Sequence, residues 1–391
     1  MRFSPNIEFL QPSPTLALQA RARQMATEGL SIIDLSAGEP SFPTPEPAVR
    51  GALQAIQDGQ TGYPPTPGIP SLREGVARYA ERQSAGDSIS ASNVLVSAGV
   101  KQALFNVLYC LFGPGDEVIV PSPYWPTYLP AVRLSGATPV TLATRWEDSF
   151  RLDPDQLEGA RTASTRAVLL NSPSNPSGAV VDADSLKQIL DWADANGIWV
   201  LSDEIYRRLA YVPGGAPSVL AQPDRPERLV VFDGVSKTFS MTGWRIGYAV
   251  GPEKLIAKAS ALQSQTTSGA AAPSQFAAAE LYRADSEREE GVADTLEVLT
   301  RRRKLGHDLL SGVAGLETRL PDGAIFFFSR ATQQRDSLVL AEELLTKAGV
   351  ACVPGEPFGT PGHLRFNFAV DESTLEEGLR RVAVHMRGGS S

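Results

Sequence analysis

The sequence predicts an α/β fold in which a large domain with a mostly parallel, seven-stranded sheet is joined to a smaller α+β domain. Short and almost entirely apolar segments, such as 94–96 and 167–170, alternate with helical patterns. This alternation is typical of parallel strands that helices cover on both faces. The pattern changes near residue 285, where a long charged helix precedes mixed elements. A chain of 391 residues with 42% hydrophobic residues can form a core of this size.

Local signals place the elements that precede the sheet. Thr15 is the expected N-cap of a helix that stops at Gly29. A short strand is expected at 32–35, and a run rich in proline and glycine at 62–68 interrupts regular structure. Residues 71–74, Ser-Leu-Arg-Glu, form a capping box that predicts the start of the next helix.

The remaining elements follow from apolar runs and helical periodicity. The strands of the large sheet are predicted at 94–96, 117–120, 139–142, 167–170, 199–202, 229–232 and 246–250. Helices are predicted between several of them, at 101–111, through Leu129 and Val132, at 185–195 and at 253–265, and a further helix before the sheet is expected to end near Gln57. The smaller domain is expected to contain a helix at 287–310, strands at 324–328 and 364–368, and a final helix at 372–384.

Composition excludes several classes of function. The net charge of −8 argues against non-specific nucleic-acid binding, which needs a basic surface. Two cysteines and three scattered histidines make a disulfide framework or a metal site unexpected. No signal peptide and no apolar run long enough for a membrane span is recognised, so a cytoplasmic protein is expected.

Polar residues follow the predicted strands at the points where catalytic groups gather in α/β sheets. Because the carboxyl ends of parallel strands share one edge, we expect these side chains to converge there. The set contains one lysine, one arginine, one carboxylate, amide and phenol groups, and a glycine turn before a helix. Its members are Gly99, Asn175, Asp203, Tyr206, Ser236, Lys237 and Arg245.

This set suits pyridoxal phosphate. A lysine amine such as Lys237 can form a Schiff base with an aldehyde cofactor. A buried carboxylate, Asp203, favours the protonated form of a pyridine nitrogen, which makes the ring an electron sink. The turn before a helix at Gly99, with Ser236 and Arg245, can hold a phosphate through backbone N–H groups and positive charge.

Longer stretches of the chain resemble the fold-type I aminotransferases of class I and II that depend on pyridoxal phosphate. The resemblance is closest to the bacterial aspartate/prephenate branch, and it runs in the expected order along nearly the whole chain. The segments that carry it are AGEP from Ala37, YPPTPGIPSLRE from Tyr63, GVKQALFN from Gly99, SPSNPSG from Ser172, SDEIY from Ser202, MTGWRIGY from Met241, VPGEPFG from Val353 and GHLRFNF from Gly362.

The resemblance implies roles for residues around the cofactor. Lys237 would be the Schiff-base lysine and the proton shuttle, Asp203 would pair with the pyridine nitrogen, and Asn175 and Tyr206 would bind the ring oxygen. Trp125 would stack on the ring. The phosphate would be held by Gly99, Val100, Lys101, Ser236 and Arg245. Tyr63 would reach the phosphate of the neighbouring subunit, so a homodimer is implied.

The resemblance also implies how a substrate would bind. Arg365 would hold the α-carboxylate, with Asn175 and the Gly38 backbone assisting and Trp125 beside it. Lys101, through Thr15 and water, would meet the distal carboxylate of aspartate or glutamate. The implied domains are 1–45 as N-terminal arm and part of the small domain, 46–285 as the large pyridoxal-phosphate domain, and 286–391 as the C-terminal small domain.

The expected function is therefore a ping-pong transfer of an amino group between an amino acid, aspartate or glutamate favoured, and a 2-oxo acid. Prephenate or aromatic amino acids, or a lyase reaction on the same scaffold, stay open as alternatives. Lys101 can also be an ordinary solvent-facing residue of a first helical turn. Departures from the branch pattern at Ser41, Pro43, Gly234, Phe326 and Phe327 affect only the choice of substrate.

Overall fold

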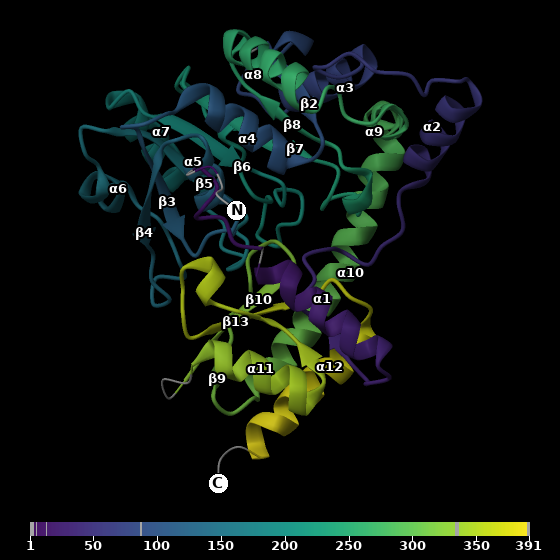
Figure 1. Cartoon of the computed structure of the whole chain (residues 1–391), viewed down its shortest axis with the longest axis vertical. Helices are drawn as coiled ribbons and strands as arrows, with labels where there is room; N and C mark the ends of the chain where they lie inside the picture. The colour runs from purple at the N-terminus through teal and green to yellow at the C-terminus, as the bar shows by residue number, and fades with distance from the viewer. Residues whose placement is uncertain (1–3, 5, 13, 87, 333–335, 389–391) are drawn as a thin grey trace.

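Three β-sheets organise the part of the chain that the computed structural model describes, which is residues 4, 6–12, 14–86, 88–332 and 336–388. Outside it lie residues 1–3, 5 and 13 of the expected N-terminal arm, residue 87 of the expected large domain, and residues 333–335 and 389–391 of the expected C-terminal domain. Seven strands form the largest sheet, four form the second, and β1 pairs with β11 in the third. Figure 1 shows the large sheet in the upper half of the molecule and the four-stranded sheet in the lower half.

The large sheet has the strand order β2-β8-β7-β6-β5-β3-β4. Its strands are β2 (Val94–Ser97), β3 (Glu117–Ser122), β4 (Thr138–Ala143), β5 (Thr165–Asn171), β6 (Trp199–Asp203), β7 (Leu229–Gly234) and β8 (Gly247–Val250). Only β8 is antiparallel to its neighbours, β2 and β7. The predicted seven-stranded, mostly parallel sheet is therefore confirmed.

Helices cover this sheet on both faces. They are α2 (Glu46–Gln57), α3 (Pro70–Glu81), α4 (Val100–Leu111), α5 (Tyr128–Leu134), α6 (Pro154–Ala160), α7 (Ala183–Ala195), α8 (Glu253–Thr266) and α9 (Ala272–Arg283). Successive side chains of a strand enter different cores, since Leu95 packs in one cluster with Leu104 while Val96 packs in another with Leu72. Both faces of the central strands are thus buried, which explains why these strands are largely apolar, while the edge strand β4 is partly exposed.

The second region combines both ends of the chain. It contains α1 (Pro14–Thr27), β1 (Ile33–Asp34), α10 (Asp285–Ser311), β9 (Leu316–Glu317), β10 (Phe326–Ala331), α11 (Ser337–Ala348), β11 (Val350–Ala351), β12 (Val353–Pro354), β13 (His363–Asn367) and α12 (Glu372–Gly388). Strand β1 runs parallel to β11, with Ile33 opposite Val350. Residues near 33 therefore fold with residues near 350, while the domain boundaries at 45 and 285 stay a prediction.

Two predicted helix caps are wrong for the same reason. Helix α3 begins at Pro70 with Ile69 as N-cap and no side-chain cap, so Ser71 lies inside the helix. Helix α1 likewise begins at Pro14, which places Thr15 within its first turn. Proline at the first helical position needs no partner for an N–H group and has a helical φ, so it starts the helix one residue early. Helices α6, α9 and α11 are additional to those predicted.

Within the described residues, no helix is both long enough and apolar enough to cross a membrane.

We predict that Gly247→Ala destabilises the protein by about 3 kcal/mol, because overpacking against backbone cannot relax. A Cβ at Gly247 would lie 2.5 Å from the carbonyl carbon of Gly99, just before α4. The matched control is Gly291→Ala, since Gly291 lies in α10 with no atom within 4 Å of its added Cβ. This control should gain about 0.5–1 kcal/mol. Urea unfolding at one protein concentration measures both, and equal stability of the two variants would contradict the prediction.

Candidate active site

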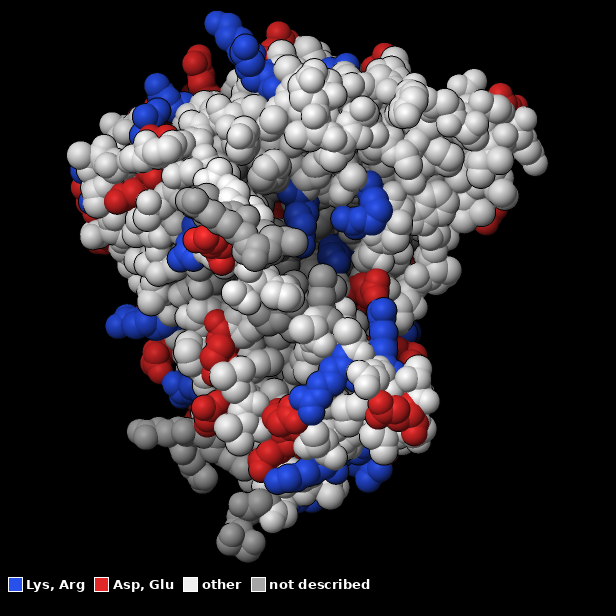
Figure 2. All heavy atoms as spheres, in the orientation of Figure 1, with Lys and Arg blue, Asp and Glu red and all other residues white. Residues whose placement is uncertain are grey.

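The carboxyl edge of the large sheet opens into a cleft of about 630 Å³. Strands β3, β5, β6 and β7 are parallel and end at this edge, so the segments that follow them meet there. The antiparallel β8 begins at the same edge, so Arg245, two residues before β8, also lies at this edge. Figure 2 shows the hollow near the middle of the molecule, with blue Lys and Arg side chains inside it.

Most of the residues singled out in the sequence meet in this cleft. Those that line it are Thr15, Gly38, Val100, Lys101, Trp125, Asn175, Asp203, Tyr206, Ser236, Lys237, Arg245 and Arg365. Gly99 lies behind the guanidinium of Arg245 and does not line the cleft. Tyr63 is also outside it, and its side chain is 99% exposed.

The carboxylate of Asp203 is buried at the end of β6. The Tyr128 hydroxyl donates to its Oδ2 over 2.7 Å, and the backbone N–H of Ile205 donates to Oδ1 over 3.2 Å. Burial nevertheless raises the pKa of Asp203 to about 6, because these two donors only partly replace lost hydration. The site thus holds a carboxylate that a cation in the cleft would stabilise.

Lys237 supplies an amine opposite this carboxylate. Its Nζ donates to the carbonyl oxygen of Gly38, which comes from the segment after β1. Burial lowers the pKa of Lys237 to about 8, while the nearby Glu39 carboxylate opposes the shift. Arg365 and Arg245 lower it further through charge repulsion. A lysine with this pKa is partly neutral near physiological pH, so it can act as a nucleophile or a base.

Arg365 is a buried guanidinium at the base of the cleft, on β13. Its Nη1 donates to the Asn175 side-chain oxygen over 2.9 Å, and its Nη2 donates to the Ser36 carbonyl over 2.7 Å. Its Nε has no partner among the described residues, although it is buried. The group lies 4.2 Å from the ring centroid of Phe326. Burial lowers the pKa of Arg365 to about 10, so it stays cationic and retains capacity for an anion.

An anion-binding corner forms where α4 begins. Gly99 is the N-cap of α4 with φ +87°, a conformation that favours glycine. A Cβ there would lie 2.6 Å from Nη2 of Arg245 and would displace this guanidinium from its present position. Arg245 is itself left-handed (φ 56°), with Nη1 donating to Thr242 over 2.8 Å. The helix N-terminus and the guanidinium together favour a bound anion.

Lys101 lies nearer the mouth of the cleft, one residue into α4. Its side chain is exposed, and its Nζ lies 5.1 Å from the ring centroid of Trp125. Partial loss of hydration lowers the pKa of Lys101, and repulsion from Arg245 adds to this. The ammonium group therefore contributes to the cleft as well as contacting solvent, which favours the binding interpretation over that of an ordinary surface lysine.

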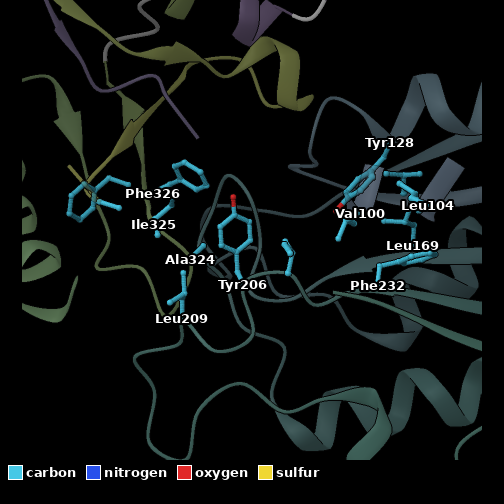
Figure 3. Close-up of a cluster of buried hydrophobic side chains, with 14 of the residues drawn as sticks. Val100, Leu104, Tyr128, Leu169, Tyr206, Leu209, Phe232, Ala324, Ile325 and Phe326 are labelled. Carbon is cyan, nitrogen blue, oxygen red and sulfur yellow. The ribbon is translucent and has the colours of Figure 1, made fainter. Parts of the chain in front are cut away.

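Three residues that line the cleft were not singled out from the sequence, and they are Tyr128, Glu39 and Arg23. Tyr128 follows Trp125 by three residues, and their rings pack edge to face with centroids 5.5 Å apart. In Figure 3, Tyr206 stands between the Phe326 side chain and the cluster that contains Tyr128. Glu39 and Arg23 also line the cleft. A signal for Arg23 was available, because it lies at helical spacing from Thr15.

The sheet and its cleft define an α/β enzyme site with an amine, a buried carboxylate and separate cationic positions. The family model for aminotransferase class I and II matches residues 31–382. The chain is 38% identical to an aspartate aminotransferase of Streptomyces avermitilis, over 97% of this chain and 95% of the relative. It is 37% identical to an aspartate/prephenate aminotransferase of Thermus thermophilus, over 97% of each.

Solved structures agree with these sequence matches. The aspartate aminotransferase from Thermus thermophilus with maleate matches with a TM-score of 0.93 and 37% identity, over 98% of this chain and 100% of that one. The protein therefore belongs to the class I and II aminotransferases, and it transfers amino groups between amino acids and 2-oxo acids.

We predict that Asp203→Asn stabilises the cofactor-free protein at pH 8 by about 3 kcal/mol. The folded pKa of about 6 lies above the unfolded value, so folded Asp203 retains its proton where the unfolded chain has lost it. Its contribution to stability is therefore lost as the pH rises from about 4 to 6. Asparagine removes this loss and can still accept from Tyr128.

Urea unfolding at pH 4 and pH 8 measures the effect, with the exposed Glu290→Gln as control. Asp203→Asn should have a higher free energy of unfolding than the wild type at pH 8 and not at pH 4. The buried Asp233, whose pKa is raised to about 7, titrates in both proteins and cancels. An Asp203→Asn protein that is less stable than the wild type at pH 8 would contradict the conclusion that the charged Asp203 carboxylate destabilises the folded protein.

Proposed function

We propose that this aminotransferase uses pyridoxal 5′-phosphate and acts on dicarboxylic amino acids, aspartate or glutamate favoured, by a ping-pong mechanism. The observation that carries the substrate class is the position of Lys101, a cation at the mouth of a cleft whose base holds Arg365. An exposed cation and a buried cation in one cleft match the two carboxylates of such a substrate.

The residues present fit pyridoxal phosphate. Lys237 offers an amine with a lowered pKa, and Asp203 offers a buried carboxylate for a pyridine nitrogen. The N-terminus of α4 at Gly99, together with Arg245 and Ser236, suits the phosphate. A Cβ at position 99 would meet the Arg245 guanidinium. Trp125 lines the same cleft and offers a flat ring face.

When bound, pyridoxal phosphate supplies a ring that withdraws electrons from the α-carbon of the substrate. Asp203 would keep a proton on the ring nitrogen by charge attraction, and the Tyr128 hydroxyl would keep Asp203 in place. The Lys237 Nζ would accept the proton from the substrate α-carbon and would then donate it to a second atom, so that it acts first as a base and then as an acid. A pKa of about 8 is suitable for both roles. Tyr206 and Asn175 would donate to the ring oxygen.

Arg365 would orient the substrate through its α-carboxylate. Its Nη1 and Nη2 already bind Asn175 and the Ser36 carbonyl, so the guanidinium is fixed before a substrate arrives. Fixed donors reduce the ordering needed on binding. The Gly38 backbone and Thr15, which line the cleft, would assist at the two ends of the substrate.

Names of relatives support the substrate class. The Streptomyces avermitilis relative is an aspartate aminotransferase, and the Thermus thermophilus structure contains maleate, a four-carbon dicarboxylate. The second candidate, prephenate, is supported by the aspartate/prephenate aminotransferase of Thermus thermophilus. Prephenate also carries a second carboxylate, so Lys101 would serve either substrate.

We also propose that the enzyme is a cytoplasmic homodimer. Tyr63 is 99% exposed on the single chain, and Leu53 and Ile56 of α2 are more than half exposed as well, at 55% and 52%. Large apolar side chains exposed on one segment favour a partner surface. In such a dimer, Tyr63 would reach the cofactor phosphate of the neighbouring subunit.

We predict that Lys101→Ser lowers kcat/KM for aspartate at least tenfold more than for phenylalanine, because only the dicarboxylate loses a charge partner. Conversion of bound pyridoxal phosphate to its amine form, followed by absorbance after adding one amino acid at a time, measures both. Lys237→Ala should abolish conversion by every amino acid and sets the baseline. Equal losses on aspartate and phenylalanine would remove Lys101 from substrate selection.

A further inference from the structure

The cleft is much more positive than the chain as a whole. Five basic side chains and two acidic ones line it among the described residues, whereas the whole chain has a net charge of −8. Four of the basic groups have proposed partners, because Lys237, Arg245, Arg365 and Lys101 serve the cofactor or the substrate. The fifth, Arg23, has none.

Arg23 reaches the cleft from one face of α1. Thr15, Gln19 and Arg23 are spaced by four residues, so they share a side of the helix, and all three line the cleft. At a rise of about 1.5 Å per residue, Arg23 lies about 12 Å along the axis from Thr15. A helical side chain leans towards the N-terminus, which directs the Arg23 side chain back over Gln19 and towards Thr15.

The guanidinium of Arg23 is exposed and uncommitted. Nothing among the residues that the structure describes forms an ion pair or a hydrogen bond with it. Its neighbour Arg21 differs, because both of its terminal nitrogens bind Glu342, with Nη2 to Oε1 at 2.7 Å. The two arginines of α1 therefore have different roles. Arg21 holds α1 against α11, and Arg23 leaves a positive charge on the cleft.

We infer that Arg23 is a specificity-determining residue that binds the distal carboxylate of acidic amino acids longer than aspartate. The inference rests on the proposed function. With the α-carboxylate held by Arg365, each added methylene moves the distal carboxylate outwards along the cleft. Lys101 and Thr15 would hold the distal carboxylate of aspartate. Arg23 lies about two helical turns beyond Thr15 on the same side of α1, so it suits the longer glutamate and 2-aminoadipate.

The test compares kcat/KM for 2-aminoadipate with that for aspartate in the holoenzyme. Arg23→Gln should lower the ratio about fivefold, the effect of one partly exposed ion pair, and mainly through KM because the contact is equal in ground and transition states. Arg23→Lys should recover most of the ratio, since the charge returns. Arg21→Gln removes the same charge from the same helix and should leave the ratio and the activity unchanged.

Three results would overturn the inference. One is an Arg23→Gln enzyme whose ratio equals that of Arg21→Gln. Another is an equal loss on aspartate and 2-aminoadipate, which would indicate general attraction of anions. The third is a wild-type enzyme that accepts aspartate but neither glutamate nor 2-aminoadipate. Failure of the proposed function is separate, because it would appear as a wild-type enzyme with no preference for aspartate over phenylalanine.

Discussion

The active site depends on a carboxylate that the fold buries without a full set of partners. Asp203 is 2% exposed, and its carboxylate receives hydrogen bonds from Tyr128 and Ile205 alone among the described residues. Burial raises the pKa of Asp203 to about 6, so its charged form is disfavoured here relative to water. A protonated pyridine ring would relieve that cost, and the same attraction would keep the ring protonated. In the proposed function, one buried charge would thus lower the stability of the cofactor-free protein and raise the reactivity of the cofactor-bound protein.

The topology of the sheet explains why so many cations lie near this carboxylate. Lys237 comes after β7, next to β6, and Arg245 precedes β8, which runs antiparallel and so starts at the same edge. Arg365 comes from the other sheet, on β13, and meets Asn175 after β5. Burial lowers the pKa of Lys237 to about 8, with repulsion from Arg365 and Arg245 adding to the shift and the Glu39 carboxylate opposing it. The basicity of the central amine is therefore a property of the assembled cleft.

The sheet and the residues at its carboxyl edge could be predicted from local rules, whereas Trp125, Arg365 and further cleft residues were expected only from the family resemblance. Apolar runs identify the buried strands, and the residue after each strand must lie at the shared edge, which located Asp203 and Lys237. Tyr128 was missed because its contact with Asp203 joins residues 75 apart on different elements. The caps at Thr15 and Ser71 were wrong because a preceding proline outweighed the side-chain signal. Tyr63 stays a prediction, since its partner would belong to another chain.

We propose that Asp203 keeps the pyridine nitrogen of the bound cofactor protonated. Nitrogen-15 NMR of labelled pyridoxal phosphate in the holoenzyme at pH 8 tests this role directly, with Asp203→Asn as the comparison. We expect a protonated pyridine nitrogen in the wild type and an unprotonated one in Asp203→Asn. An unprotonated nitrogen in the wild type, or the same chemical shift in both proteins, would contradict it.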